Sequence, residues 1–228
     1  LDYPEQALVD RVPLLREVVD GLPEQMATPL GRFLDHVAAT ELGELQTDYV
    51  DTFDVTRKCA LHLTYFLHGD TRNRGVALVQ IKQLYRRHGV ELSDGDAELP
   101  DHLAVVLEFG ASVAPDVTWK LLNDHRVGIE LLRRALSTRE SPWGDVIQAI
   151  RSTLPSLDGD DEVALARLIA EGPPQETVGL DDTALNAPYA IDPALDEMQA
   201  PSADCGHGST PASSSQTLGP TIPVGAPR

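Results

Sequence analysis

The spacing of apolar residues is the feature that most constrains the fold of this chain. Apolar residues recur every three or four positions, as Met26, Leu30, Phe33 and Val37 do, whereas runs with the alternation of a β-strand are absent. About 170 residues of amphipathic helix are enough to enclose one hydrophobic core. The sequence therefore predicts an all-α fold, a single-domain bundle of about eight to nine helices.

Proline and glycine residues indicate where these helices begin and end. Gly21 and Gly89 follow helical patterns, and Pro23 precedes one. Asp70 or Thr71 is expected to cap a helix that runs to His88, the residue before Gly89. These signals divide the chain into short helices joined by short loops.

Four expectations concern individual helix boundaries. Pro13 should break or kink the first helix near its start. Residues 57–67 should form a short helix. Ser141 should cap another helix, one that begins near Pro142. Pro115 should open one long helix whose inward face carries Val117, Leu121, His125, Ile129, Leu132 and Leu136.

The composition changes after Gly172. Residues 173–228 are rich in proline, glycine, serine, alanine and aspartate. Such a segment cannot bury enough apolar surface to offset the entropy lost on ordering. We predict a helical domain over residues 1–172 and a disordered acidic tail over 173–228. The opening residues begin in mid-pattern, so we also expect an N-terminal segment to be missing from this sequence.

Charge excludes some partners. The net charge is -18, which argues against binding to nucleic acid or to anionic membrane surfaces and suits a basic partner. No apolar run approaches the roughly 18 residues that would span a bilayer, so membrane insertion is not expected. The two cysteines, Cys59 and Cys205, form no disulfide framework, which favours the cytoplasm.

The sequence lacks the strong catalytic and metal-binding motifs. It contains no phosphate-binding glycine loop, no Gly-x-Ser-x-Gly, no Cys-x-x-Cys and no His-Glu-x-x-His. We expect His125 to be a satisfied core residue, Cys59 to be a small buried hydrophobe, and His62 and His68 to lie on opposed helix faces. The protein is thus predicted not to be an enzyme and to bind no metal or cofactor. Asp-His pairs at 35–36 and 101–102 leave a helical metal-dependent hydrolase as an alternative.

Residues 49–75 are the densest part of the chain in aromatic and charged side chains. An apolar spine is formed by Tyr49, Phe53, Leu61, Leu63, Phe66 and Leu67, and a charged rim by Asp51, Asp54, Asp70, Arg72 and Arg74. This combination is typical of a corner between helices that is held by caps and ion pairs. It is equally typical of a groove wall for a peptide that carries apolar anchors and basic residues. The residues alone leave both interpretations open.

Three segments carry a resemblance to a known family. "YVDTFD" (49–54), "LHLTYFLHGDTRNRG" (61–75) and "ELPDHLAVVLEFGA" (98–111) occur in this order. The chain resembles the NarJ-type nitrate reductase assembly chaperones over roughly residues 1–170. The wider group of redox enzyme maturation chaperones carries a Glu-Pro-x-Asp-His motif. Its counterpart here is Glu98, Pro100, Asp101 and His102, with Leu99 inserted and no residue between the proline and the aspartate.

The resemblance implies a cytoplasmic chaperone without a bound cofactor of its own. It would bind the N-terminal tail of the apo catalytic subunit of respiratory nitrate reductase, keep it competent for insertion of the molybdenum cofactor, and delay membrane docking. Molybdenum cofactor biosynthesis proteins are further candidate partners, and a regulatory peptide-binding adaptor is a further alternative. The implied client-peptide residues are Tyr49, Phe53, Asp54, Leu63, His68, Asp70, Arg72, Arg74, Glu98, Pro100, Asp101 and His102.

Overall fold

The architecture is helical throughout the part of the chain that the structure describes. The structure, a computed structural model, describes residues 1–92 and 98–176, and Leu1–Gln175 belong to one compact unit. Within the described residues there are ten α-helices and no strand, and the only β-type pairing is an isolated bridge between His62 and His102. The all-α prediction is confirmed, with ten helices instead of eight to nine. The predicted tail lies outside the described residues from position 177 onward.

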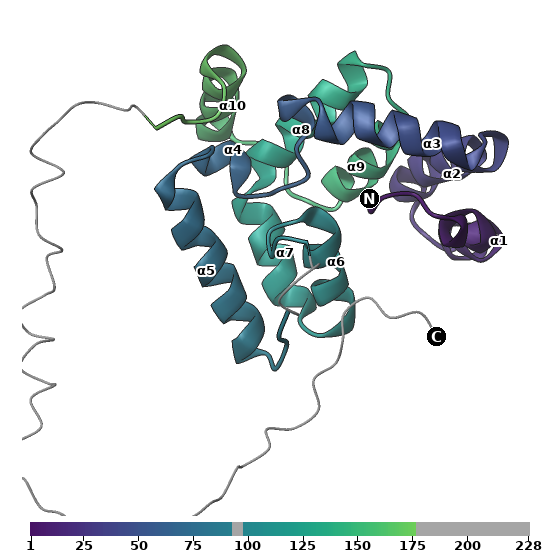
Figure 1. Ribbon diagram of the computed structural model, residues 1–228, viewed down its shortest axis with the longest axis horizontal. Helices are drawn as coiled ribbons and strands as arrows, with labels where there is room; N and C mark the ends of the chain where they lie inside the picture. The colour runs from purple at the N-terminus through teal and green to yellow at the C-terminus, as the bar shows by residue number, and fades with distance from the viewer. Residues whose placement is uncertain (93–97, 177–228) are drawn as a thin grey trace, which may run out of the picture. The chain divides into compact units, whose positions relative to one another are not determined.

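Most of the helices follow one another through short connections, whereas longer segments precede α4 and α6 (Figure 1). Their bounds are α1 (Gln6–Asp20), α2 (Glu24–Ala39), α3 (Leu42–Tyr49), α4 (Tyr65–His68), α5 (Arg72–Arg87), α6 (Leu103–Ser112), α7 (Pro115–Asp124), α8 (Arg126–Thr138), α9 (Trp143–Ser152) and α10 (Gly159–Glu171). A π-helical turn, Val50–Asp54, extends α3, and Arg57–Cys59 form a 3-10 turn. The helix α5 ends at Arg87, and Gly89 follows two residues later with a positive φ of 77°, close to the end that the sequence predicted.

The main core lies between α2, α8 and α9. The helix α9 packs along α2 on one side and α8 on the other. Val37, Leu136 and Ile147 come from these three helices and are fully buried. A smaller cluster, Ile81, Tyr85, Phe109 and Ala114, joins α5 to α6 and the residues that follow it. The two clusters fix the helices in place, which brings the segments that precede α4 and α6 close enough to pair.

A buried carboxylate links α8 to α9. Glu130 accepts hydrogen bonds from Arg133 (2.8 and 2.9 Å) and Arg134 (2.8 Å) on its own helix, and Arg151 of α9 lies 3.4 Å away. Burial alone would raise the pKa of Glu130, but the hydrogen bonds from the two α8 arginines lower it to about 2. The carboxylate is therefore charged at neutral pH, and three guanidinium groups surround it.

Three local predictions differ from the structure: the chain does not break at Pro13, and neither Ser141 nor Thr71 caps a helix. The helix α1 continues through Pro13, because this proline is exposed and water can solvate the Val9 carbonyl that loses its helical partner. The helix α9 begins at Trp143, and the buried Ser141 hydroxyl has no hydrogen-bond partner, so it does not cap the helix. Thr71 precedes α5, but its hydroxyl donates to the His68 carbonyl (2.7 Å) and makes no cap.

The predicted long helix from Pro115 is divided at His125. Its ring Nδ1 donates to the carbonyl of Leu121 at 2.8 Å, the group that a continuous helix would bond to the His125 N–H. The His125 N–H bonds instead to Leu122 O at 3.2 Å, and α8 begins at the next residue. His125 is thus satisfied by a hydrogen bond, as predicted, but it is half-buried beside the groove instead of in the core, and it separates α7 from α8.

The predicted helix over residues 57–67 is interrupted. Its ends are helical, as the 3-10 turn Arg57–Cys59 and as α4 from Tyr65, but residues 60–62 are not helical. The backbone between the two turns pairs with a segment about forty positions away: Leu63 N–H bonds to Asp101 O (3.0 Å) and Leu103 N–H to Leu61 O (2.8 Å). Peptide groups engaged across the molecule cannot also form the bonds of a helix. Cys59 is fully buried, as expected for a small hydrophobe.

Candidate functional site

Asp101 holds together the corner between α4, α5 and α6. Its side chain is 0% exposed. Its Oδ2 accepts hydrogen bonds from the Thr64 amide (3.2 Å) and the Thr64 hydroxyl (2.5 Å), and Arg74 Nη2 lies 3.9 Å away. Arg74 also bonds to Asp70 (3.3 Å) and lies over the Tyr65 ring. Asp101 therefore acts as a clamp between segments in this conformation and is not open to a ligand.

His102 and His62 lie beside this clamp. Their rings are 5.4 Å apart in an edge-to-face arrangement. Burial lowers the pKa of both, although the charge of Asp101 opposes the shift. The Nδ1 of His102 is buried without a hydrogen-bond partner. The neighbouring Pro100 carbonyl accepts the Tyr85 hydroxyl at 2.7 Å. The sequence analysis placed His62 and His68 on opposed faces of one helix. This prediction is wrong, because His62 lies before α4, outside any helix.

Tyr49 and Phe53 belong to the core. They are 7% and 8% exposed, and their rings lie 5.4 and 5.7 Å from that of Trp143. Burial raises the pKa of Tyr49, and the charges of Asp54 and Glu98 add to the shift. These two carboxylates are exposed. Tyr49 and Phe53 are therefore part of the core, and Asp54 and Glu98 lie on the surface nearby.

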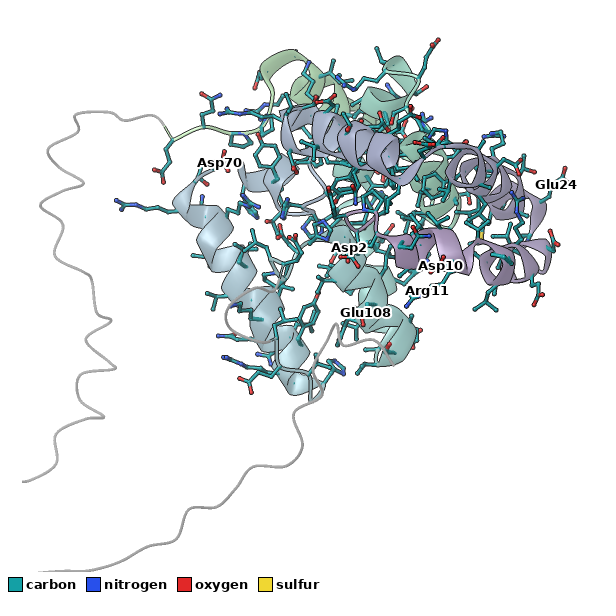
Figure 2. All side chains as sticks on the ribbon, turned by 45° about the vertical axis from the view of Figure 1, so that its right-hand side comes forward. Asp2, Asp10, Arg11, Glu24, Asp70 and Glu108 are labelled. Carbon is teal, nitrogen blue, oxygen red and sulfur yellow. The ribbon has the colours of Figure 1, made fainter. Side chains whose placement is uncertain are left out.

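The twelve predicted residues thus fall into three environments. Tyr49, Phe53, Leu63, Pro100, Asp101 and His102 are buried; His68 and Arg74 are half-buried; Asp54, Asp70, Arg72 and Glu98 are exposed. Asp70 lies at the start of α5 (Figure 2). The structure brings Leu63, Asp70, Arg74, Asp101 and His102 to one corner, and puts Tyr49 and Phe53 in a separate aromatic cluster.

A groove with a volume of about 820 Å³ runs between α4, the α7–α8 junction and α10. Its apolar lining includes Leu63, Phe66, Leu67, Val127, Val163, Ala164 and Leu168. Leu67 is 58% and Val163 70% exposed. Three acids, Asp124, Asp160 and Glu171, lie among the lining residues. An apolar floor with acidic edges is the combination that the sequence analysis expected of a peptide groove, here built largely from other residues.

The groove is negatively charged at neutral pH. Its three acids are offset by a single cation, Arg167, and burial lowers the pKa of His125, which leaves that ring uncharged. Glu171 pairs with Arg167 (2.9 Å) and Asp124 with Lys120 (2.5 Å). Both pairs are exposed, and exposed pairs are weak, so the two carboxylates remain available to a cation from outside.

Three residues of the predicted apolar spine, Leu63, Phe66 and Leu67, line this groove, although only Leu63 was among the predicted client-peptide residues. The sequence analysis missed the walls contributed by α7, α8 and α10. The available signal was the apolar content of α10, in which Val163 and Leu168 line the groove while Leu165 is the one buried residue of the helix. Apolar residues in excess of those needed for packing indicate a second contact surface.

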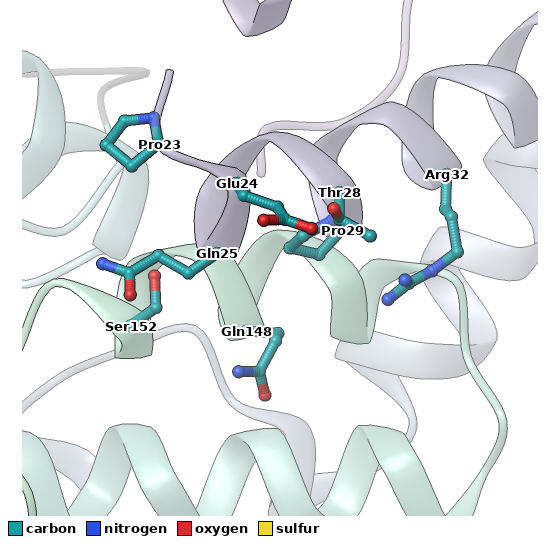
Figure 3. A pocket seen from close by; sticks show the side chains of 8 residues that line it. All are labelled: Pro23, Glu24, Gln25, Thr28, Pro29, Arg32, Gln148 and Ser152. Carbon is teal, nitrogen blue, oxygen red and sulfur yellow. The ribbon is translucent and has the colours of Figure 1, made fainter.

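Two other hollows contain none of the predicted residues. One, of about 670 Å³, is a shallow depression between α2 and α9, where Figure 3 shows mainly polar side chains such as Glu24, Gln25 and Gln148. The other, of about 380 Å³, is apolar and lies between α2, α6, α7 and α9. In residues 1–92 and 98–176, no three potential ligand side chains come together to hold a metal ion. The helices in these ranges are all too short or too polar to cross a bilayer.

Comparison with known proteins decides the family. Residues 19–148 match the family model described as the nitrate reductase delta subunit. The chain belongs to this family. The match includes the three segments, 49–54, 61–75 and 98–111, that carried the resemblance, which is thereby confirmed. The match ends at residue 148, before α10, which forms one wall of the groove.

Relatives of this chain include assembly chaperones. The nitrate reductase molybdenum cofactor assembly chaperone NarJ of Escherichia coli K12 is 31% identical over 205 residues, which cover 87% of this chain and 80% of NarJ. The probable chaperone NarJ of Bacillus subtilis is 25% identical over 158 residues, or 69% of this chain and 85% of that protein. These relatives are named as chaperones and not as catalysts.

A third relative is much longer than the region it shares. The nitrate reductase-like protein NarX of Mycobacterium tuberculosis H37Rv is 37% identical over 153 residues, which are 67% of this chain but only 23% of NarX. The chain therefore spans less than a quarter of NarX and most of the length of the NarJ relatives.

Proposed function

We propose that this chain is an assembly chaperone for a respiratory nitrate reductase. In the cytoplasm it would bind the N-terminal tail of the apo catalytic subunit, keep that subunit competent for molybdenum cofactor insertion, and delay its docking to the membrane. The observation that carries the proposal is the 31% identity to a NarJ assembly chaperone across 87% of the chain. The chaperone itself would hold no cofactor, and molybdenum cofactor biosynthesis proteins would act on the client that it holds.

The groove between α4, the α7–α8 junction and α10 is our candidate for the client site. Its exposed Leu67 and Val163 side chains would receive the apolar anchors of a client peptide. Its edge carboxylates, Asp124, Asp160 and Glu171, would face the basic residues of the same peptide. Capture of an amphipathic helix in a groove needs this pairing of apolar floor and complementary charge.

The residues predicted from the sequence would contribute in different ways. Leu63 would contact the client directly as part of the floor. His68 and Asp70 flank Gly69, against which a groove residue packs, and would meet one end of the peptide. Asp101 and His102 would act indirectly, by holding the corner from which α4 projects.

Binding of one client conformer is sufficient for the chaperone's action. A protein that binds only the unloaded conformer stabilises that conformer by mass action. Insertion of the cofactor then favours a competing conformer in which the N-terminal tail is withdrawn, and the chaperone dissociates. No nucleotide is required for this cycle.

A charge-reversal experiment tests the placement of the client. The ligand is a labelled peptide of the first fifteen or so residues of the catalytic subunit, and its affinity is measured by fluorescence anisotropy. We expect Asp124→Lys with Asp160→Lys to weaken binding by more than about tenfold, or about 1.4 kcal/mol. Glu24→Lys with Glu108→Lys is the matched control: it changes the net charge equally, and Glu24 lies in the first turn of α2 as Asp160 does in that of α10.

The two double variants separate the possible outcomes. Loss of affinity in the groove variant alone supports the client site. Loss in the control alone would move the site to the α2–α9 depression, which Glu24 lines. Failure of the wild-type chain to bind the peptide at all, together with full molybdenum content in nitrate reductase from cells that lack the chain, would refute the chaperone function.

A further inference from the structure

The chain returns to the groove after its last helix. The helix α10 ends at Glu171, and Gly172 has a φ of 77°, a backbone conformation that favours glycine. The next residues, Pro173, Pro174 and Gln175, line the same groove as Leu67 and Val163. One wall of the candidate client site is therefore made by a segment without secondary structure of its own.

This segment, residues 172–175, is packed tightly at one point. An ideal Cβ built on Gly69 would lie 1.7 Å from the carbonyl oxygen of Pro174 and 2.8 Å from its carbonyl carbon. Gly69 is buried and has a φ of 58°, so only glycine fits both the turn after α4 and the approach of the second backbone. The contact joins the end of α4, one side of the groove, to the segment that leaves α10, the other side.

We propose that residues 172–175 form a strap that covers one end of the groove and that a client peptide must displace. The inference rests on the proposed function, since it concerns how the client gains access to that site. Two consecutive prolines keep the strap stiff, so little conformational entropy is lost when it lies against Gly69. Because the strap is part of the same chain, it competes at a high effective concentration and lowers the apparent affinity of any ligand.

The strap also gives the groove a preference. The sequence Gly-Pro-Pro-Gln carries no charge, so it uses the apolar floor but gains nothing from Asp124, Asp160 and Glu171. A neutral apolar peptide competes only for the apolar contacts, for which the tethered strap has the higher effective concentration, whereas a basic apolar peptide has the additional attraction of the acidic edge. The strap would therefore exclude neutral apolar segments and yield to a basic client tail.

Loosening the strap in the full chain tests the proposal. Pro173→Gly with Pro174→Gly raises the entropy of the displaced strap and leaves the opposite walls unchanged. We expect the client peptide to bind roughly three- to tenfold more tightly, and a neutral peptide of the same apolar pattern to become detectable. Gly69→Ala, which displaces the Pro174 carbonyl from the other side, should shift the affinity in the same direction. Pro155→Gly, exposed and outside the groove, is the control and should change nothing.

A spin label reports the displacement itself. A nitroxide on Gln175→Cys, in a chain with Cys205→Ser, should give a slow-motion spectrum that sharpens when the client peptide saturates the groove. An unchanged affinity in the proline variant and an unchanged spectrum, while Asp124→Lys with Asp160→Lys still weakens the peptide, would refute the strap and leave the client groove standing. Affinity that responds to none of these variants would refute the groove itself.

Discussion

Asp101 offers the sharpest test of how this fold supports its function. Replacement by alanine removes the acceptor of the Thr64 amide (3.2 Å) and hydroxyl (2.5 Å) and the buried partner of Arg74 (3.9 Å). Hydrogen bonds to a charged group are worth about 1.5–3 kcal/mol each, and breaking a buried ion pair costs about 3–5 kcal/mol. Relief from the desolvation of the carboxylate offsets part of the sum, so we expect Asp101→Ala to lower the free energy of unfolding by about 3–5 kcal/mol.

Asp101→Asn is the informative comparison. The amide oxygen can still accept both Thr64 hydrogen bonds, and only the charge is lost, so the expected decrease is about 1–2 kcal/mol. Urea unfolding, followed by the fluorescence of the buried Trp143, gives both values. At about 2–4 °C per kcal/mol, the alanine variant should melt roughly 6–20 °C below the wild type.

The same two variants separate a clamp from a ligand contact. If Asp101 is a clamp, Asp101→Asn binds the client peptide within about twofold of the wild type at temperatures where both are folded. The reasoning fails if Asp101→Ala unfolds within 1 kcal/mol of the wild type. It fails equally if Asp101→Asn keeps its stability but loses more than about tenfold in peptide affinity, because the carboxylate would then touch the client.

Two further predictions concern the core. The pKa of Glu130 is about 2 in the folded chain and lies near 4.5 otherwise, so its stabilisation is present above pH 4.5 and is lost as the pH falls towards 2; Glu130→Gln should flatten this acid limb, worth at most about 3 kcal/mol, in unfolding measured from pH 5 to 2. An unchanged limb would show that other carboxylates dominate it. Gly110→Ala would place a Cβ 2.6 Å from the buried Thr118 side chain and should cost about 1–3 kcal/mol, whereas Gly31→Ala in α2 meets no atom within 4 Å and should be neutral or stabilising by up to about 1 kcal/mol. Equal melting temperatures for the two variants would contradict this packing.

Much of the secondary structure could be predicted because it depends on short sequence distances. The apolar period of α2 and the glycine after α5 are local signals, and both matched the structure. The family resemblance also came from contiguous segments. The exceptions have local causes that periodicity does not contain, such as the His125 ring taking the carbonyl of Leu121.

The sequence by itself determined that the chain is helical, acidic and without a catalytic motif, because these properties follow from residue type and from spacings of three or four positions. Only the tertiary structure decided that Asp101 accepts hydrogen bonds from Thr64, that Glu130 pairs with Arg151 of another helix, and that α10 forms a groove with Leu63. Each of these contacts joins residues that are at least 21 positions apart in the sequence. Their formation depends on how the whole core packs, which is a sum over many weak apolar contacts that no short pattern reports.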